Sequence, residues 1–205
     1  MTNLGSFILR YNPGMSIVLS QVELGRNRQL EIRAGDLTEE HVDVIVNAAN
    51  QWLDHGAGVA AAIIRKGGVN IQRESNTWIA MHGQITHDQP AYTQAGELPC
   101  HYVVHAVGPI WGEGHEEDKL RRTILGTLDL ATQLGAITLA IPAISTGIYG
   151  FPKDKAAPIF FDAIQEFWLK NTKSTLTNIR ITIIDEPTIT VFLNAFKKWK
   201  KALIK

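Results

Sequence analysis

The 205-residue chain contains a single cysteine, Cys100, so it cannot form an intrachain disulfide or a cysteine-based zinc site. It also lacks an excess of either charge, because 20 Lys and Arg residues balance 20 Asp and Glu residues. This balance argues against nucleic-acid binding driven by bulk charge. No apolar run reaches the ~18 residues of a membrane span, and residues 1–14 do not resemble a signal peptide. We therefore expect a cytoplasmic protein without a membrane span or a nucleic-acid partner.

Several signatures of catalysis are missing as well. The seven histidines show no H-E-x-x-H or other metal-binding spacing. The chain has no G-x-S-x-G nucleophile elbow and no phosphate-binding P-loop motif. Cys100 has no activating context and His105 lies inside an apolar run, so we interpret both as core residues. We expect neither a metal nor a cofactor.

The distribution of apolar residues predicts an α/β fold in one domain. Nearly continuous apolar runs, typical of parallel strands covered on both faces, alternate with apolar stripes at helical spacing. This alternation predicts a mostly parallel sheet with helices on both faces. We expect strands at residues 42–46, 102–107, 138–144 and 179–184, and helices around residues 120–131, 159–167 and 189–203.

The ends of the chain and one central segment follow other patterns. β-Branched runs at residues 15–22 and 30–34 flank turn residues and predict a hairpin, and residues 1–14 end in a turn signal that marks a loose extension. Residues 84–99 predict a loop with one or two short edge strands. Five of the last nine residues are lysines, which suits the C-terminal end of a helix, with a basic patch for a partner as the alternative.

Three segments follow predicted strands, where open α/β sheets bind their ligands. The first segment is residues 35–38 (GDLT). Asp36 in this segment either caps the helix that we expect next or presents its carboxylate to a ligand amine. The sequence alone leaves both interpretations open.

The second segment begins with Asn47 and Asn50 at the end of an apolar strand, and Gly56 and Gly58 then open an Ala-rich helix. A helix N-terminus offers free N–H groups and partial positive charge, and glycines let a ligand approach the backbone. These features predict an anion site that suits a diphosphate. The asparagine amides can bind sugar hydroxyls, since they both donate and accept, or they can cap the loop.

The third segment is residues 144–152 (ISTGIYGFP), which again lie between an apolar strand and a predicted helix. Small residues and two glycines predict a second backbone cradle for an anion. Tyr149 and Phe151 either wall a cleft or plug a tight turn.

A competing interpretation comes from Gly56, Gly58 and Ala61, which fit the dinucleotide fingerprint G-x-G-x-x-G/A and would indicate an oxidoreductase. The match is weak because residues 47–55 separate these glycines from their strand. In addition, no acidic residue follows at the end of a second strand ~20 residues later.

Taken in order and spacing, the segments GDLT (35–38), VDVIVNAAN (42–50), HGAGVAAAI (55–63), HAVGP (105–109) and ISTGIYGFP (144–152) resemble a macrodomain. The resemblance extends over residues 15–203. It implies a three-layer α/β/α fold with a central mixed sheet, formed by one domain over residues 15–205, and a cleft for ADP-ribose.

The resemblance also implies roles for particular residues. Asp36, beside Leu37, would accept from the adenine amine, the two Gly-rich segments would wrap the diphosphate, and Asn50 would face the distal ribose. The expected ligand-binding residues are Asp36, Leu37, Ala49, Asn50, His55, Gly56, Ala57, Gly58, Val59, Ala60, Pro142, Ser145, Thr146, Gly147, Ile148, Tyr149, Ile184 and Asp185, with Asn50, Gly58 and Gly147 serving catalysis.

Many macrodomains cleave the esters that link ADP-ribose to Asp or Glu side chains, and also deacetylate O-acetyl-ADP-ribose, by positioning a water without a metal. The resemblance therefore implies a metal-independent hydrolase whose partners are ADP-ribose and mono-ADP-ribosylated proteins. This chain has Ala60 where many hydrolytic members have aspartate, Ala57 in place of a glycine, and Ile184 where some relatives have an aromatic residue. A non-catalytic ADP-ribose reader is the alternative.

Overall fold

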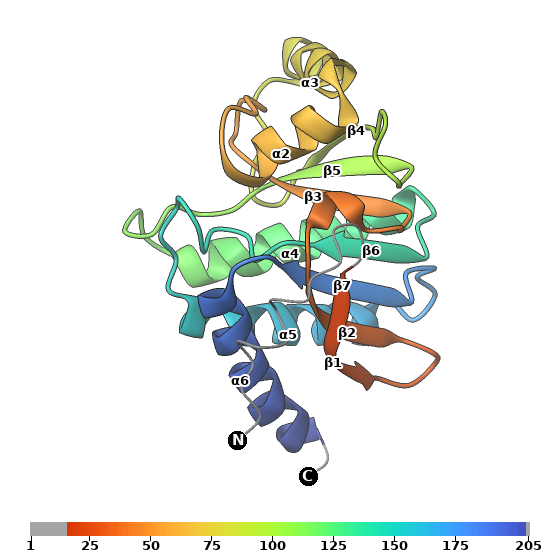
Figure 1. The fold of residues 1–205 in the computed structure, drawn as a ribbon, viewed down its shortest axis with the longest axis vertical. Coiled ribbons are helices and arrows are strands. Elements are labelled where there is room, and N and C mark those ends of the chain that lie inside the picture. The colour runs from red at the N-terminus through yellow and green to blue at the C-terminus, as the bar shows by residue number, and fades with distance from the viewer. Residues whose placement is uncertain (1–15, 204–205) are drawn as a thin grey trace.

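The structure is a computed structural model, and it describes residues 16–203. Within these residues, seven strands form one mixed sheet in the order β1-β2-β7-β6-β3-β5-β4 (Figure 1). The edge strands β1 and β4 are antiparallel to their neighbours, whereas the inner strands run parallel. The strands are β1 (Ile17–Glu23), β2 (Gln29–Ala34), β3 (Val44–Ala49), β4 (Ala91–Gln94), β5 (Tyr102–Val107), β6 (Thr138–Ile141) and β7 (Asn178–Ile183).

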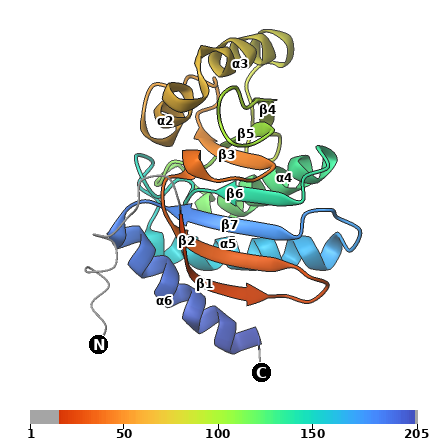
Figure 2. The same cartoon turned by 45° about the vertical axis from the view of Figure 1, so that its right-hand side comes forward.

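Helices cover both faces of the sheet, because the inner strands are apolar on both sides. Val44 and Val46 of β3 face one core cluster, which includes residues of α4, α5 and α6. Ile45 faces a second cluster with Ile63 and Ile71. The helices are η1 (Leu37–Glu39, a 3₁₀ turn), α2 (Gly58–Gly67), α3 (Val69–His82), α4 (Glu116–Gln133), α5 (Lys153–Lys170) and α6 (Glu186–Leu203). This arrangement confirms the predicted three-layer α/β/α fold, and Figure 2 shows α2 and α3 beside the β3–β4 end of the sheet.

The N-terminal hairpin and the edge strand are also confirmed. β1 pairs antiparallel with β2, and the connecting residues 25–27 all have positive φ angles, which suit a tight turn. The segment 84–99 contains the short edge strand β4, which pairs with β5. The extension expected at residues 1–14 lies outside the described residues.

Two elements are shorter than expected, whereas the strand expected at residues 42–46 continues to Ala49. The helix expected after Asp36 is only the 3₁₀ turn η1, because the chain bends to bury Glu40, whose carboxylate accepts from Thr182 Oγ1 at 2.7 Å and pairs with Arg180 at 2.9 Å. The strand expected at residues 138–144 ends at Ile141, since Pro142 has no N–H group to continue the ladder.

Candidate functional site

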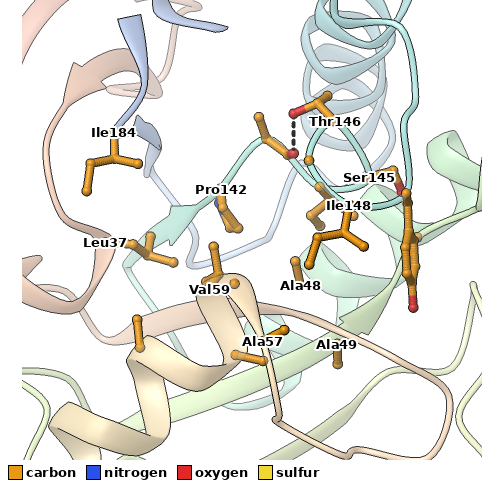
Figure 3. Close-up of a pocket in the computed structure, with 18 of the residues that line it drawn as sticks. Leu37, Ala48, Ala49, Ala57, Val59, Pro142, Ser145, Thr146, Ile148 and Ile184 are labelled. Atoms are coloured by element: carbon orange, nitrogen blue, oxygen red, sulfur yellow. Dashed lines mark hydrogen bonds between the residues drawn. The ribbon is translucent and has the colours of Figure 1, made fainter.

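The carboxyl ends of β2, β3, β5, β6 and β7 meet at one edge of the sheet and border a cleft of about 650 Å³ (Figure 3). The cleft is lined by residues of the three segments that the sequence singled out, together with the end of β7. Of the 18 predicted ligand residues, 17 line it, and His55 does not. The segments that follow the strands therefore lie at the cleft, as the sequence predicted.

The N-terminus of α2 opens onto the cleft without a cap. Ala57 precedes the helix in an extended conformation, and its methyl side chain cannot cap the helix. The first helical hydrogen bond runs from the Ala61 N–H to the Ala57 carbonyl at 3.2 Å. The N–H groups of Gly58, Val59 and Ala60 therefore have no helical acceptor. Gly58 has φ +59°, which explains the need for glycine at this turn.

The loop between β6 and α5 lies across the cleft from this helix. Ser145 has φ +68°, and its carbonyl accepts from the Phe151 N–H at 2.9 Å. Thr146 Oγ1 donates to the Ala143 carbonyl at 2.8 Å (Figure 3). Within residues 16–203, the N–H groups of Gly147, Ile148 and Tyr149 donate to no protein acceptor.

The two segments approach each other over the middle of the cleft. A Cβ placed on Gly58 would lie 3.7 Å from Ile148 Cδ1. Arg65 is the single basic residue among those that line the cleft in the described part of the chain. The sequence predicted an anion site from its glycines, and the structure places the uncapped start of α2 and residues 147–149 along the same cleft.

The carboxylates Asp36 and Asp185 also line the cleft, next in sequence to Leu37 and Ile184, which Figure 3 labels on one side of it. Asp36 Oδ1 accepts from the Thr38 N–H at 2.9 Å and from Thr38 Oγ1 at 2.7 Å, so the expected capping interaction is present. Asp185 Oδ1 accepts from the Thr188 N–H at 3.0 Å. Burial by itself would raise the pKa of Asp185. The hydrogen bonds from Thr188 and the charge of Lys153 outweigh this effect, so the pKa lies below its ordinary value and Asp185 stays ionised.

Asn50 lines the cleft and also holds the loop that follows β3. Its Oδ1 accepts from the N–H groups of Trp52 at 3.0 Å and Asp54 at 3.1 Å. Its Nδ2 donates to the Asp54 carbonyl at 2.8 Å. Both interpretations of Asn50 are therefore compatible, because these bonds cap the loop and use only one of the two amide hydrogens.

Asn47 and His55 form part of a buried network beneath the cleft. Asn47 Nδ2 donates to Nδ1 of His55 at 3.1 Å and to Nδ1 of His105 at 3.0 Å. The two Nε2–H groups then face Ser75 Oγ at 2.9 Å and Thr93 Oγ1 at 3.0 Å. Burial lowers the pKa of His55 to about 4 and that of His105 well below its usual range, so both rings are neutral.

This network corrects the expectation for His55. The side chain is 5% exposed and its ring points into the core instead of toward a ligand. Helix α3, which the sequence analysis did not predict, supplies Ser75 and thereby holds the ring there. His105 is a satisfied core histidine, as expected.

Eleven residues that line the cleft were not among the predicted ligand residues, although six of them fall within the segments quoted from the sequence. Most of them adjoin a predicted residue, and Ala62 and Arg65 lie on the same helical face as Val59, so the strand ends and helical spacing were the available signals. They are Gly35, Thr38, Ala48, Asp54, Ala62, Arg65, Gly108, Ala143, Ile144, Thr182 and Ile183.

Residues 16–203 contain no group of three or more His, Cys, Asp or Glu side chains arranged to hold a metal ion. None of the helices in this range has the length and apolar character to cross a membrane.

The family model described as Macro domain matches residues 46–160. A protein of Enterobacter sp. named O-acetyl-ADP-ribose deacetylase is 46% identical over 141 residues, which are 68% of this chain and 78% of that protein. An uncharacterized protein of Thermotoga maritima is 44% identical over 173 residues, which are 83% of this chain but only 29% of that longer protein. The solved macrodomain of Oceanobacillus iheyensis with ADP has a TM-score of 0.83 and 27% identity, and the match covers 92% of this chain and 98% of that one.

Proposed function

Because the chain belongs to the Macro domain family, we propose that it binds ADP-ribose and hydrolyses mono-ADP-ribose esters of acidic side chains. The observation that carries the proposal is the pair of facing backbone segments, the start of α2 and residues 147–149, whose N–H groups have no acceptor among residues 16–203. Such groups stabilise the two negative charges of a diphosphate without a cation. The cleft volume of about 650 Å³ suits a nucleotide-sized ligand.

The proposed pose follows the chemistry along the cleft. The adenine lies at the Leu37 and Ile184 end, where its amine donates to Asp36 and its ring contacts apolar side chains. The diphosphate lies between the two backbone segments. The distal ribose then lies beside Asn50, whose remaining amide hydrogen donates to a sugar hydroxyl.

Ester hydrolysis in such a site depends on positioning and on electrostatic stabilisation. The backbone N–H groups hold the diphosphate, and the Asn50 amide holds the distal ribose. The ester is thereby fixed in a position that a water can reach. The same arrangement suits O-acetyl-ADP-ribose, the ester named in the Enterobacter relative. Mono-ADP-ribosylated proteins are the proposed partners.

One observation favours a second candidate function, that of a non-catalytic ADP-ribose reader. Ala60, in the first turn of α2, lines the cleft with only 5% exposure and offers no acidic side chain. A reader uses the same binding contacts and has negligible turnover.

The test is to incubate the protein with a polypeptide that is mono-ADP-ribosylated on glutamate and to follow ADP-ribose release. We expect release by the wild type and none by Asn50→Ala. If the wild type binds ADP-ribose but releases none, the reader is the correct function.

Gly147→Glu tests the site itself. A Cβ on Gly147 meets nothing within 4 Å, so the variant should fold, but its carboxylate enters the diphosphate region and should abolish binding. Ala80→Glu on the exposed side of α3 adds the same charge outside the cleft and serves as the control. Tight ADP-ribose binding by Gly147→Glu would refute the site assignment.

A further inference from the structure

Three carboxylates line the cleft in residues 16–203, and they lie in different places. Asp36 and Asp185 adjoin Leu37 and Ile184, and each accepts hydrogen bonds from a nearby threonine. Asp54 belongs instead to the loop that Asn50 holds. It is therefore the carboxylate at the end of the cleft where the distal ribose and the ester would lie.

The Asp54 backbone is fixed from both sides. Asn50 bonds both its N–H group and its carbonyl, as described above. The preceding Leu53 carbonyl accepts from Gln72 Nε2 at 2.9 Å, and the following His55 is buried. Residues of α3 therefore hold the loop on which Asp54 stands.

The Asp54 side chain is exposed and lines the cleft. A Cβ placed on Gly56 would lie 4.0 Å from Asp54 Oδ1. The structure shows no hydrogen bond or ion pair of the Asp54 carboxylate with any other residue it describes, and its two oxygens can accept from water. A general base must be held in place and must be able to accept a hydrogen bond from the water. The fixed backbone and the solvent-exposed carboxylate of Asp54 meet these two conditions.

Three other residues considered for this role cannot act as the proton acceptor. Ala60 has no functional group, and the His55 ring faces the core with both nitrogens hydrogen-bonded. Burial, together with the charge of Glu113, raises the pKa of Tyr149, so its hydroxyl keeps its proton.

We propose that Asp54 is the catalytic general base of the hydrolysis and replaces the aspartate that is absent at Ala60. This assignment rests on the proposed hydrolase function. The water oxygen bonds to the anomeric carbon of the distal ribose while the bond from that carbon to the ester oxygen breaks. The electron pair leaves with the glutamate carboxylate, and Asp54 takes the proton of the water and passes it to solvent. The products are ADP-ribose and the free glutamate side chain.

The experiment compares Asp54→Asn and Asp54→Ala with the wild type on glutamate-linked mono-ADP-ribose. Asp118→Asn, on the exposed surface of α4, removes the same charge outside the cleft and is the matched control. We expect Asp54→Asn to lower kcat about 100-fold or more, with the Kd for ADP-ribose within about threefold of wild type by calorimetry. Added formate should restore turnover to Asp54→Ala in a concentration-dependent way, which a merely structural role would not allow.

The outcomes separate this assignment from the function on which it rests. Turnover by Asp54→Asn within threefold of wild type would overturn the role of Asp54 and leave hydrolysis intact. Parallel loss of binding and turnover, without rescue by formate, would also overturn it and make Asp54 a binding residue. A wild type that binds ADP-ribose without releasing it from the ester would overturn the hydrolase function and the base together.

Discussion

The imidazole rings of His55 and His105 stack in the core with centroids 4.9 Å apart and an interplanar angle of 23°. One amide nitrogen, Asn47 Nδ2, donates to both rings. Neither ring can take a proton at Nδ1 without losing this bond, and a proton on either ring would leave a charge in the core. The hydrogen bonds of Asn47 link β3 to His105 in β5 and to His55 in the loop before α2. These links are intact only while both rings are neutral.

This pairing predicts that acid destabilises the protein. In the unfolded chain a histidine has a pKa near 6.5, whereas in the folded chain burial lowers the pKa of His55 to about 4 and that of His105 well below its usual range. As the pH falls below 6.5, the unfolded chain binds protons that the folded chain does not, so the free energy of unfolding falls. We expect His55 alone to contribute a loss of about 2 kcal/mol between pH 6.5 and 5, with a further loss in the same direction from His105, measured by urea unfolding.

The variant with His55→Gln and His105→Gln separates this effect from that of other titrating groups. Its free energy of unfolding should depend less on pH over this range than that of the wild type. His101→Gln changes a histidine whose side chain is 74% exposed and should keep the wild-type dependence. Equal pH dependence in all three proteins would contradict the interpretation.

Most of the fold could be predicted from the sequence because apolar periodicity reports burial directly. The runs at residues 102–107 and 179–183 are almost entirely buried, whereas Ile184 is exposed, and the stripe at 189–203 matches α6 closely. Helix α3 was not predicted because its face toward the core holds few apolar residues. Its buried residues are Ile71 and Ser75, and Ser75 is there to meet His55.

The candidate site was predictable where backbone geometry makes it. Glycines and strand ends signal a backbone cradle, and residues 56–60 and 145–149 do line the cleft. Side-chain direction was less predictable. His55 lies between two residues that line the cleft, yet its ring turns to Asn47 and Ser75, partners that only the folded chain brings close. Asp54 was overlooked for the converse reason, because its sequence context resembles an ordinary loop.

Cys100 provides a test of burial beside α2 and α3. Its side chain packs against the core cluster that contains Ile45 and Ile63, and burial raises the pKa of the thiol to about 12. The thiolate is the reactive form, so we expect iodoacetamide at pH 8 to modify native Cys100 far more slowly than the unfolded chain in urea. Mass spectrometry over time measures both rates, and equal rates would show that the thiol is accessible.

Gly96 provides a test of the close approach between α2 and the loop after β4. It has φ +60°, and a Cβ at this position would overlap the Gly67 carbonyl oxygen. Both the backbone strain and the overlap oppose a side chain, so we expect Gly96→Ala to lower the free energy of unfolding by about 2 kcal/mol or more. Gly25→Ala is the control, because it shares a positive φ but meets nothing within 4 Å. A smaller loss for Gly96→Ala than for Gly25→Ala, measured by urea unfolding, would contradict the overlap.

Gly108 and Ser145, which both line the cleft, are also so close that there is no space for a side chain on the glycine. A Cβ on Gly108 would overlap Ser145 Oγ and lie 2.5 Å from Ile144 Cγ2. Gly108→Ala must therefore displace the loop that carries residues 147–149, and we expect its affinity for ADP-ribose to fall at least about tenfold, a cost of roughly 1.4 kcal/mol.

Ser145→Gly tests this explanation as a second-site change. Ser145 has φ +68° and a buried hydroxyl without a partner in the described structure, so its replacement by glycine relieves strain and removes an unsatisfied group. Alone, Ser145→Gly should bind ADP-ribose about as tightly as the wild type. Combined with Gly108→Ala, it should recover part of the lost affinity, because only the contact with Ile144 remains. Strictly additive changes in the binding free energy, measured by calorimetry on all four proteins, would show that the two residues do not interact.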